Sequence, residues 1–582
     1  MLSNKPGISN LVTICAEKGI KTVVISPGSR NAPLIISFSE HGGFDCLSIP
    51  DERVAAFFAL GIAQQTRIPV IITCTSGTAS LNFAPAIAEA FYQKIPLLVL
   101  TADRPVEWIG QGEGQSIRQK QVYANYVKRS YELPQEPETH DDLWSNDRII
   151  CEAIDQTTLG VPGPVHINVP LREPLYGRKE NISPTFPKII RTMPVDKSIL
   201  SVQLRDLTSE WTRTNKKMIL CGLSPMVPDT KGGHTQLNEQ LARLNADNTV
   251  VIFSEVTSNV FTKSSISNFD SLLSAPEIVS GNQKKYSPDL LITLGDSFIS
   301  KKIKNWIRSN RPPVHWHIGT DNYYLDTFQS LTRSIPLSPH VFFKQWLSFL
   351  DDTRQDLSAS TITDSFRENW TRLKKFVRIK QRDYLQGIGW SDLRAFHVLL
   401  PQLPENTNLH LANSTPIRYA QLFEPRRDIT YNANRGVAGI DGSSSTAAGA
   451  AFVTGRATTL ITGDLSFFYD SNALWHRYLT PLFRIVLINN EGGNIFRFIS
   501  GPDTTNQLSE FFEAGQQADA EFIARAFKLN YFVADNEEVL KKVIPEFFQM
   551  QPNNRPALLE IKTPGIESAK IWRDYFAFLK ET

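Results

Sequence analysis

Residues Lys21–Arg30 read KTVVISPGSR and decide the fold class. The run Lys21–Ser26 is largely β-branched and apolar, and a Pro-Gly turn ends it, which is typical of a buried strand. The same pattern recurs at Pro69–Ala79, PVIITCTSGTA, and at Ile95–Pro105, IPLLVLTADRP. A helical segment at about 10–18 precedes the first run, a second at 54–65 lies between the first two runs, and a third follows Ser76-Gly77 through Phe91. This alternation predicts a parallel sheet that is covered on both faces and binds ligands beyond the carboxyl ends of its strands.

Two further units repeat the alternation. A Pro- and charge-rich connection, Glu173–Asp196, precedes the second unit, and a polar stretch, Asp351–Asp364, precedes the third. We therefore expect an α/β protein with three doubly wound parallel-sheet domains, at about residues 1–180, 195–350 and 365–582. The expected strands of the last two domains are Lys217–Cys221, Thr249–Phe253, Asp289–Leu294, Val314–His317, Asn408–Ala412, Thr458–Thr462, Phe483–Asn489 and Ala557–Ile561.

The composition excludes several classes of protein. Apolar residues make up 41% of the 582 residues and charged residues 21%, with a formal net charge of +2, so no basic field indicates nucleic-acid binding. The five cysteines are widely spaced and form no CxxC pair, which argues against a disulfide framework or a zinc site. The N-terminus lacks a signal-peptide pattern and the apolar runs are too short to span a bilayer. We expect a cytoplasmic protein.

The last unit contains the strongest local signal for a metal site. One predicted strand leads into Gly463-Asp464, and a second leads into Asn489-Asn490. Neighbouring strand ends present their ligands side by side, and a carboxylate, an amide oxygen and a backbone carbonyl suit Mg²⁺. The alternative is a strand-ending turn followed by a surface loop.

Small residues fill the segment Gly439–Ala451, GIDGSSSTAAGAA. They permit a helix start whose backbone amides approach a phosphate closely. The alternative is a helix that packs on its sheet through Ser and Ala, although packing explains Gly439, Asp441 and Gly442 less well.

Glu52 is a candidate acid at the other end of the chain. It follows Ile49-Pro50-Asp51 and opens an apolar helix, RVAAFFALGIA. A carboxyl group in an apolar site has a raised pKa and can share a proton. A glutamate here is commonly a favourable charge in the first turn of a helix, and Asp51 is a competing acid.

A set of motifs resembles the 2-succinyl-5-enolpyruvyl-6-hydroxy-3-cyclohexene-1-carboxylate synthase family of thiamine-diphosphate enzymes. Leu465, which follows Gly-Asp where the wider superfamily usually has Gly, is expected in this family. Both terminal units carry motifs, and the middle unit matches mainly in architecture. The motifs are SPGSRNAPL at Ser26–Leu34, TSGTA at Thr75–Ala79, ADRP at Ala102–Pro105, NRGVAGIDG at Asn434–Gly442, GDLSFFYD at Gly463–Asp470 and NNEGGNIF at Asn489–Phe496.

The resemblance implies thiamine diphosphate and Mg²⁺, or Mn²⁺, as cofactors. Glu52 is the implied catalytic residue, beside the aminopyrimidine ring. The implied metal ligands are Asp464, Asn490 and the carbonyl of Gly492. Further implied cofactor contacts are Asn413, Ser414, Gly463 and Ile440, which bends the cofactor. The implied substrate contacts are Ser29, Arg30, Arg104, Gln115, Lys301, Arg418, Arg435, Ile495, Phe496 and Ile499.

Two positions leave questions open. Lys302 and Lys304 make the register at Lys301 uncertain. Glu491 lies where relatives often have Asn, next to the expected metal loop, and we expect its side chain to face outward.

The family is a group of transferases in menaquinone biosynthesis. It decarboxylates 2-oxoglutarate and adds the succinyl carbanion equivalent to isochorismate in a 1,4 fashion. Both substrates carry carboxylates, so a cationic site with Arg forks is expected. The resemblance also implies a homodimer or homotetramer, because the two ends of the cofactor bind different subunits.

Three other functions stay open at this point. Another thiamine-diphosphate lyase, such as an acetolactate-synthase-like enzyme, would need fewer cations than Arg30 and Arg104 supply. A catalytically silent scaffold on the same fold would not need Glu52, Asp464 and Asn490. A Rossmann nucleotide enzyme is disfavoured because no GxGxxG follows a strand.

Overall fold

The computed structural model describes residues 2–178, 187–193, 195, 197–223, 233–281, 283–321, 323–353, 366–499, 501–550 and 553–581 of the 582-residue chain. The contacts within the chain divide it into two compact units. Unit 1 comprises Met1–Val195, Asn434–Gly455 and Tyr469–Thr480. Unit 2 comprises Asp196–Ala433, Arg456–Phe468 and Pro481–Thr582.

The first sheet lies in unit 1 and has the strand order β2-β1-β3-β4-β6-β5. Every neighbouring pair is parallel. Its strands are β1 (Thr22–Ile25), β2 (Asp45–Ser48), β3 (Val70–Cys74), β4 (Leu97–Asp103), β5 (Ser130–Glu132) and β6 (Val165–Pro170). The helices of this part are α1 (Pro6–Glu17), α2 (Ala32–Glu40), α3 (Glu52–Thr66), α4 (Thr78–Asn82), α5 (Ala84–Gln93) and α6 (His140–Thr158).

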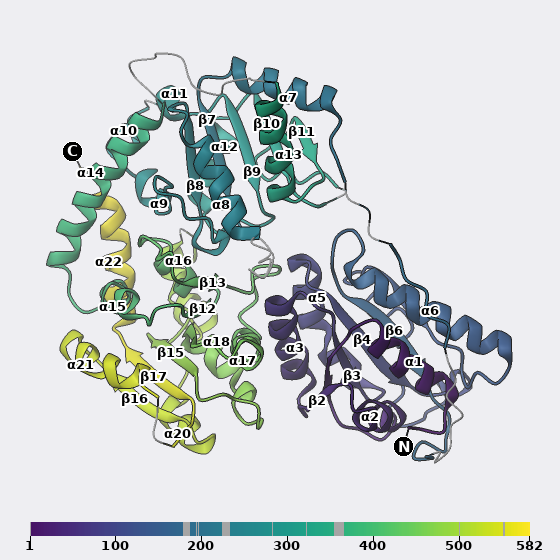
Figure 1. Ribbon diagram of the computed structural model, residues 1–582. Helices are drawn as coiled ribbons and strands as arrows, with labels where there is room; N and C mark the ends of the chain where they lie inside the picture. The colour runs from purple at the N-terminus through teal and green to yellow at the C-terminus, as the bar shows by residue number, and fades with distance from the viewer. Residues whose placement is uncertain are drawn as a thin grey trace. The chain divides into compact units, whose positions relative to one another are not determined.

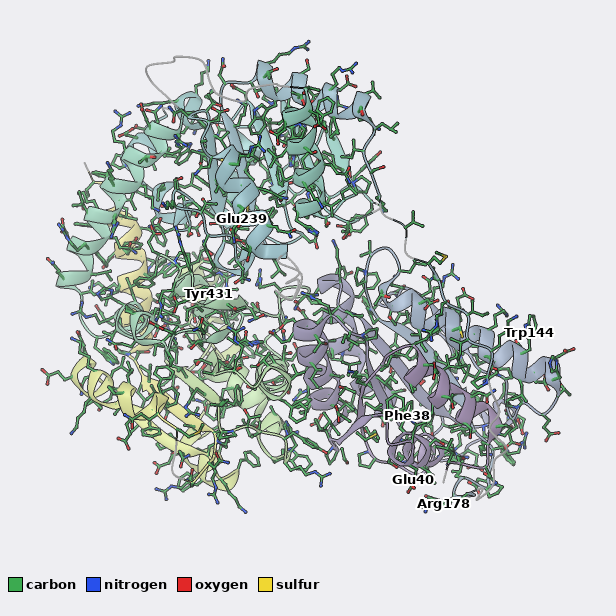
Figure 2. All side chains as sticks on the ribbon, in the orientation of Figure 1. Phe38, Glu40, Trp144, Arg178, Glu239 and Tyr431 are labelled. Carbon is green, nitrogen blue, oxygen red and sulfur yellow. The ribbon has the colours of Figure 1, made fainter. Side chains whose placement is uncertain are left out.

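Helices cover both faces of the first sheet, with α1 and α6 on one side and α3 and α5 on the other (Figure 1). Alternate strand residues serve the two layers, since Val23 joins the core beneath α1 and α6 while Val24 points to the opposite face. Both valines are fully buried. The covering helices are amphipathic: on α2, Phe38 is buried and Glu40 is exposed (Figure 2).

The central sheet lies in unit 2 and has the order β11-β10-β9-β7-β8, again all parallel. Its strands are β7 (Lys217–Cys221), β8 (Val250–Ser254), β9 (Leu290–Leu294), β10 (Val314–Ile318) and β11 (Arg333–Ile335). The helices around it are α7 (Ser201–Arg213), α8 (Gly233–Leu244), α9 (Phe269–Leu272), α10 (Pro276–Val279), α11 (Gln283–Tyr286), α12 (Lys301–Ser309) and α13 (Pro339–Asp352).

The third sheet, also in unit 2, has the order β13-β12-β14-β15-β17-β16 and is parallel throughout. Its strands are β12 (Asn408–Leu411), β13 (Thr430–Asn432), β14 (Thr458–Gly463), β15 (Phe483–Asn489), β16 (Asn530–Ala534) and β17 (Ala557–Lys562). The helices of this part of the sequence are α14 (Phe366–Gly387), α15 (Asp392–Leu399), α16 (Thr415–Ala420), α17 (Ser443–Thr454), α18 (Asp464–Tyr469), α19 (Ile495–Phe498), α20 (Ala520–Ala526), α21 (Glu537–Phe548) and α22 (Gly565–Phe578).

One hydrophobic core joins the two sheets of unit 2. It runs from Phe253 on β8 through Trp370 on α14 to Leu411 on β12 and Val486 on β15. Because α14 buries apolar side chains in this shared core, the central and third sheets form one compact unit.

The predicted fold class, an α/β protein with three parallel sheets, is confirmed. The strands β7 and β15 have the bounds that were expected, and the other expected strands agree to within a residue or two. The expected limits of the three domains stay a prediction. Residues 354–364 of the polar stretch and residues 179–186, 194 and 196 of the Pro-rich connection lie outside the described residues. All five cysteines are free, and none of the described helices has the length and apolarity that a membrane span requires.

Candidate active site

Asp51 starts α3 as its N-cap residue, and both of its carboxylate oxygens are engaged. Oδ1 accepts a hydrogen bond from the Val54 backbone N–H (3.1 Å), and Oδ2 accepts one from the Asn472 side-chain amide (2.7 Å). A carboxylate held in this way serves the helix start. The structure therefore favours Glu52 over Asp51 as the acid that contacts a ligand.

Glu52, the first residue of α3, is half-buried. Burial raises the pKa of its carboxyl group, the helix backbone N–H opposes this shift, and the charge of Asp51 adds to it. On its other side, Arg53 donates to the Tyr469 carbonyl (2.8 Å) and lies over the Tyr469 ring at 4.6 Å. The two neighbours of Glu52 thus fix its backbone to residues 469–472 of unit 1.

The small-residue helix α17 packs on α3, also within unit 1. A Cβ atom on Gly61 of α3 would lie 2.0 Å from the Thr446 carbonyl oxygen, and one on Gly449 of α17 would lie 2.0 Å from the Phe58 carbonyl oxygen. Each glycine therefore lets the backbone of the other helix approach. The expected small-residue packing exists, but its principal partner is this helix and not a sheet.

The loop before α17 contains two predicted site residues, Arg435 and Ile440. The Asn434 side-chain amide donates to Thr446 Oγ1 (3.0 Å) and fixes the start of the loop on α17. Ile440 is 42% exposed and Val437 is 54% exposed. Both apolar side chains are therefore at the surface of unit 1, and the contact of Ile440 with a cofactor stays a prediction.

Arg30 and Arg104 lie close together at the carboxyl edge of the first sheet. Arg30 is 4% exposed and donates to the Leu171 carbonyl (3.0 Å) and to Glu173 (3.3 Å). Burial lowers the pKa of its guanidinium, and the charge of Arg104 lowers it further. Two nearby arginines favour an anion between them. Ser29 is exposed on the adjoining turn.

Arg104 and Gln115 are held near each other by the loop after β4. Arg104 donates to the Gly114 carbonyl (2.9 Å), one residue before Gln115. Gln115 has a left-handed backbone (φ 55°) and lies against Gly77, where an added Cβ would be 3.1 Å from its Cα. The TSGTA turn and the ADRP turn therefore meet, as parallel neighbours β3 and β4 require.

A buried polar network supports this edge, and sequence reasoning missed it. Asn168 on β6 donates to Asp103 Oδ2 (2.9 Å), and Asp103 Oδ1 accepts from the Arg104 backbone N–H (2.8 Å). Gln119 donates to Asn168 Oδ1 (3.2 Å) and accepts from the Gly77 N–H (2.8 Å). Polar residues within the otherwise apolar strands β4 and β6 were the available signal.

In unit 2, Asp464 follows β14 directly and is 2% exposed. Its Oδ1 accepts from the Leu465 N–H and its Oδ2 from the Gly492 N–H, both at 2.7 Å. Burial raises the pKa of this carboxyl group to about 6, against the lowering effect of those hydrogen bonds. Each oxygen has a second lone pair, so the carboxylate could also bind a cation.

Asp392 orients Asn490. No signal in the sequence identified Asp392 as part of the site. Asn490 is 8% exposed, and its side-chain NH₂ donates to Asp392 Oδ2 (2.9 Å). Asp392 is fully buried and also accepts from Thr563 Oγ1 (2.5 Å). With the NH₂ group engaged, the amide oxygen of Asn490 faces away from Asp392, which is the orientation that a metal ligand needs.

The loop after β15 has the conformation expected of an oxygen-donating turn. Glu491 is exposed, in agreement with the expected outward orientation, and its backbone is left-handed (φ 67°). The Gly492 carbonyl accepts from the Asn494 N–H (2.8 Å) and retains one lone pair. A Cβ atom on Gly463 would meet no described atom within 4 Å, so the end of β14 faces open space. These residues fit Mg²⁺ and a diphosphate.

Four predicted substrate residues line one cavity of unit 2, with a volume of about 600 Å³. They are Lys301, Arg418, Ile495 and Ile499. The lining also includes the cations Lys302, Arg573 and Lys580, the acid Asp270 and the apolar residues Phe498, Trp572 and Phe576. The cavity is therefore cationic with an apolar wall, which suits a carboxylate attached to a carbon skeleton.

Of the three lysines at the start of α12, the structure favours Lys301 as the one that contacts a ligand. Lys302 donates to Ser274 Oγ (2.7 Å) and lies 3.2 Å from the centre of the Phe576 ring, and burial lowers its pKa to about 8. Lys304 donates to the Phe298 carbonyl (3.0 Å). Lys301 is exposed at the cavity wall.

The remaining predicted residues of unit 2 lie in two places. Asn413 is buried. Ser414 precedes α16 as its N-cap residue with a positive φ of 73°, and its carbonyl accepts a hydrogen bond from the Arg418 guanidinium. Phe496 packs against Phe512, with ring centres 5.4 Å apart, and is not part of the cavity lining.

The predicted residues thus form groups within two units. Unit 1 contains Ser29, Arg30, Glu52, Arg104, Gln115, Arg435 and Ile440, and unit 2 contains Lys301, Asn413, Ser414, Arg418, Gly463, Asp464, Asn490, Gly492, Ile495, Phe496 and Ile499. Their roles, and their union in one cleft, stay predictions.

Comparison with known proteins identifies the family. Residues 7–122, which include Glu52, match the family model "Thiamine pyrophosphate enzyme, N-terminal TPP binding domain". The chain is 39% identical to the 2-succinyl-5-enolpyruvyl-6-hydroxy-3-cyclohexene-1-carboxylate synthase of Flavobacterium johnsoniae, over 97% of this chain and 98% of that one. It is 39% identical to the synthase of the same name from Porphyromonas gingivalis, over 99% and 98%. It is 36% identical to that from Bacteroides thetaiotaomicron, over the full length of both. The chain therefore belongs to the 2-succinyl-5-enolpyruvyl-6-hydroxy-3-cyclohexene-1-carboxylate synthase family of thiamine-diphosphate-dependent enzymes.

Proposed function

We propose that this chain decarboxylates 2-oxoglutarate and adds the succinyl unit to isochorismate, with thiamine diphosphate and Mg²⁺ or Mn²⁺ as cofactors. The product is 2-succinyl-5-enolpyruvyl-6-hydroxy-3-cyclohexene-1-carboxylate, an intermediate of menaquinone biosynthesis. When bound, thiamine diphosphate supplies the electron sink that cleavage of a carbon–carbon bond beside a carbonyl requires.

The observation that carries the proposal is the raised pKa of the Glu52 carboxyl group together with its fixed position at the start of α3. Thiamine chemistry requires a carboxyl group that shares a proton with the aminopyrimidine ring. Burial raises the pKa of Glu52, and its neighbours Asp51 and Arg53 hold the backbone while its own carboxyl stays half-buried at the helix start. Glu52 is thus suited to hold and move that proton.

The metal and diphosphate are assigned to the carboxyl edge of the third sheet. Asp464 would supply carboxylate oxygens, Asn490 its amide oxygen and Gly492 its carbonyl, with Asp392 fixing Asn490. Gly463, Asn413 and Ser414 would contact the diphosphate, and Ile440 would support the bend of the cofactor.

The substrates are assigned to the cationic groups of both units. Arg30 and Arg104 lie together with Ser29 and Gln115 nearby, and Arg435 belongs to the same unit. The cavity of unit 2 adds Lys301 and Arg418 beside the apolar Ile495 and Ile499. These side chains would bind carboxylates and align the reacting carbons, so that most of their contribution is positioning and charge complementarity.

The assembly and location follow from the same family assignment. We infer a cytoplasmic homodimer or homotetramer in which the pyrimidine-binding part of one subunit meets the diphosphate-binding part of another. The limits 1–180, 195–350 and 365–582 are proposed for the pyrimidine-binding, central and diphosphate-binding domains. Light scattering coupled to gel filtration checks the assembly, and a monomer that is fully active would contradict it.

A coupled assay tests the reaction. Purified protein is incubated with 2-oxoglutarate and isochorismate, with and without thiamine diphosphate and Mg²⁺, and product and carbon dioxide are measured. We expect turnover that depends on both cofactors and on both substrates. Equal turnover with pyruvate in place of 2-oxoglutarate would indicate an acetolactate-synthase-like enzyme. Absence of thiamine diphosphate binding by calorimetry would indicate a scaffold.

A further inference from the structure

A buried glutamate on α5, Glu89, contacts the loop that contains Arg435 and Ile440. Glu89 belongs to unit 1 and is 3% exposed. Its Oε1 accepts from the Gly436 backbone N–H and its Oε2 from the Val437 backbone N–H, both at 2.7 Å. One side chain thus binds consecutive main-chain donors of a loop that is far away in the sequence.

The hydrogen-bond donors around Glu89 match an ionised carboxylate, although burial raises the pKa of this carboxyl group and those hydrogen bonds only oppose the rise. The Gln93 side-chain amide donates to Oε1 (2.5 Å), and the Ala438 backbone N–H is a further donor. An ionised carboxylate only accepts hydrogen bonds, whereas its protonated form would present an O–H to these donors. Gln93 in turn accepts from Gln64 of α3 (3.2 Å), so the contact also joins α5 to the Glu52 helix.

The loop itself is held in an unfavourable backbone conformation. Ala438 has φ 65°, a left-handed conformation that a residue with a Cβ atom rarely adopts. Such strain persists only where the surrounding structure imposes it. Gly436 lies directly on α5, because a Cβ atom there would be 2.6 Å from the Glu89 carbonyl oxygen. The backbone of the loop faces α5 while Val437 and Ile440 are exposed.

We propose that Glu89 is a positioning residue, which fixes the backbone of residues 436–438 so that Arg435 is presented to a substrate carboxylate and Ile440 to the cofactor. The inference rests on the proposed function for what those two side chains contact. Holding a loop in its binding conformation before a ligand arrives removes the ordering cost of binding. Glu89 therefore acts on affinity and alignment and takes no part in proton transfer.

Glu89→Gln tests the proposal with Asp147→Asn as its control. The glutamine has nearly the shape of Glu89 but turns one acceptor oxygen into an NH₂ group that faces backbone N–H donors. Asp147 is a buried carboxylate of the same unit, 5% exposed, which accepts hydrogen bonds from the side chains of Asn10 (2.8 Å) and Asn146 (3.4 Å) and from the Lys188 N–H (3.3 Å). These hydrogen bonds all lie away from residues 434–440, so their loss leaves the loop in place.

Three measurements separate positioning from stability. In hydrogen-exchange mass spectrometry, we expect the amides of residues 436–438 to exchange about tenfold faster or more in Glu89→Gln and at the wild-type rate in Asp147→Asn. In the coupled assay, we expect kcat/KM to fall about tenfold or more in Glu89→Gln, mainly through a higher KM. Its Tm should fall no further than that of Asp147→Asn.

Several outcomes would overturn the proposal. Wild-type exchange at residues 436–438 in Glu89→Gln would show that the carboxylate does not hold the loop. Faster exchange with equal kinetic losses in both variants would make the contact merely structural. If Glu89→Gln does not fold, Gln93→Met removes one donor from Glu89 and must shift exchange and KM in the same direction. If the wild-type enzyme does not turn over these substrates, the proposed function fails. The role of Glu89 is then decided by hydrogen exchange at residues 436–438 and by the Kd of thiamine diphosphate, both of which should rise in Glu89→Gln if Glu89 positions the loop.

Discussion

The first and third sheets share one strand order but differ in the chemistry of their carboxyl edges. The orders β2-β1-β3-β4-β6-β5 and β13-β12-β14-β15-β17-β16 correspond strand for strand. The end of β4 carries Arg104, a cation, whereas the corresponding end of β15 carries Asn490 beside the carboxylate of Asp464. The shared topology decides where a ligand binds, and the residues that follow the strands decide the charge at that edge.

The two acids of the proposed site differ in burial and in how their carboxyl groups are held. Glu52 is half-buried and its backbone is held by contacts of its neighbours. Asp464 is nearly inaccessible, and backbone amides bind both of its oxygens. The first arrangement suits a group that shares a proton, and the second suits a fixed ligand for a cation. The predictions below test this contrast.

The largest effect is expected for Glu52→Gln. Loss of a proton-sharing group should lower kcat by about 10²–10⁴-fold while the Kd of thiamine diphosphate changes much less. Asp51→Asn is the control, because asparagine also caps a helix, and it should keep most of the activity. Stopped-flow kinetics and calorimetry measure both quantities. Near-normal turnover of Glu52→Gln would remove Glu52 from the catalytic role.

Asp464→Asn should mainly affect the metal. Removing the charge from a cation ligand should weaken Mg²⁺ affinity by about 100-fold, as titration calorimetry in the presence of thiamine diphosphate would show. Glu491→Gln, a neutralised carboxylate in the neighbouring loop, should bind Mg²⁺ nearly as the wild type does, since Glu491 is exposed. Equal losses in the two variants would mean that general charge, and not coordination, sets the affinity.

Arg104→Lys should have an intermediate effect. Lysine keeps the charge but lacks the planar fork that binds a carboxylate through two hydrogen bonds. We expect KM for one of the carboxylate substrates to rise about tenfold with little change in cofactor affinity. Arg148→Lys, at an exposed arginine on α6, is the matched control and should be silent. A change confined to cofactor binding would move Arg104 out of the substrate site.

Gly61→Ala tests the contact between α3 and α17. The added methyl group would lie 2.0 Å from the Thr446 carbonyl oxygen, so the helices must separate. Overpacking of this kind should lower the free energy of unfolding by about 1–3 kcal/mol, measured by denaturant titration. A methyl group on Gly389 meets no described atom within 4 Å, and Gly389→Ala should cost far less. Similar values for the two variants would argue against the close contact.

The smallest effect is a pH dependence that originates at Asp470, which holds the start of α17. Its carboxylate accepts from the Ser445 N–H (2.8 Å), and burial raises its pKa to about 6. Between the unfolded pKa and this value the folded protein binds the extra proton, so stability should rise as the pH falls from 7 to 5. Asp470→Asn should flatten that slope by an amount on the order of 1 kcal/mol. A slope that persists unchanged would assign it to another group.

The fold could be predicted because its central strands are long and apolar. β3, β4 and β15 are buried along nearly all of their length, and the sequence marks them clearly. The edge strands β2, β5, β11, β13 and β16 were missed, since they are short or partly exposed, as DCLS and SYE are. The buried strand β6, VHINVP, was missed as well. A short, polar edge strand lacks the pattern that would distinguish it from a loop.

The pattern of residues predicted the site best where its residues directly follow strands, whereas Glu52, Arg435 and Ile440 were identified through the family resemblance. Asp464, Asn490 and Arg104 have this signal. Asp392 and Glu89 act from distant segments, and only folding brings them to the groups that they orient. Glu89 left one trace, because it lies among Ala86, Ile87 and Ala90 on the buried side of α5. A charged residue on an apolar helix face is costly without partners, and its presence there indicates that partners exist.

The cationic cavity of unit 2 has a consequence for chemical intervention. Its lining contains Lys301, Lys302, Arg418, Arg573 and Lys580, and Asp270 is its acid. A compound designed to occupy it would gain affinity from negative charge, and that same charge slows passage through lipid. Delivery into a living cell would therefore call for a masked acid, such as an ester that hydrolyses after uptake.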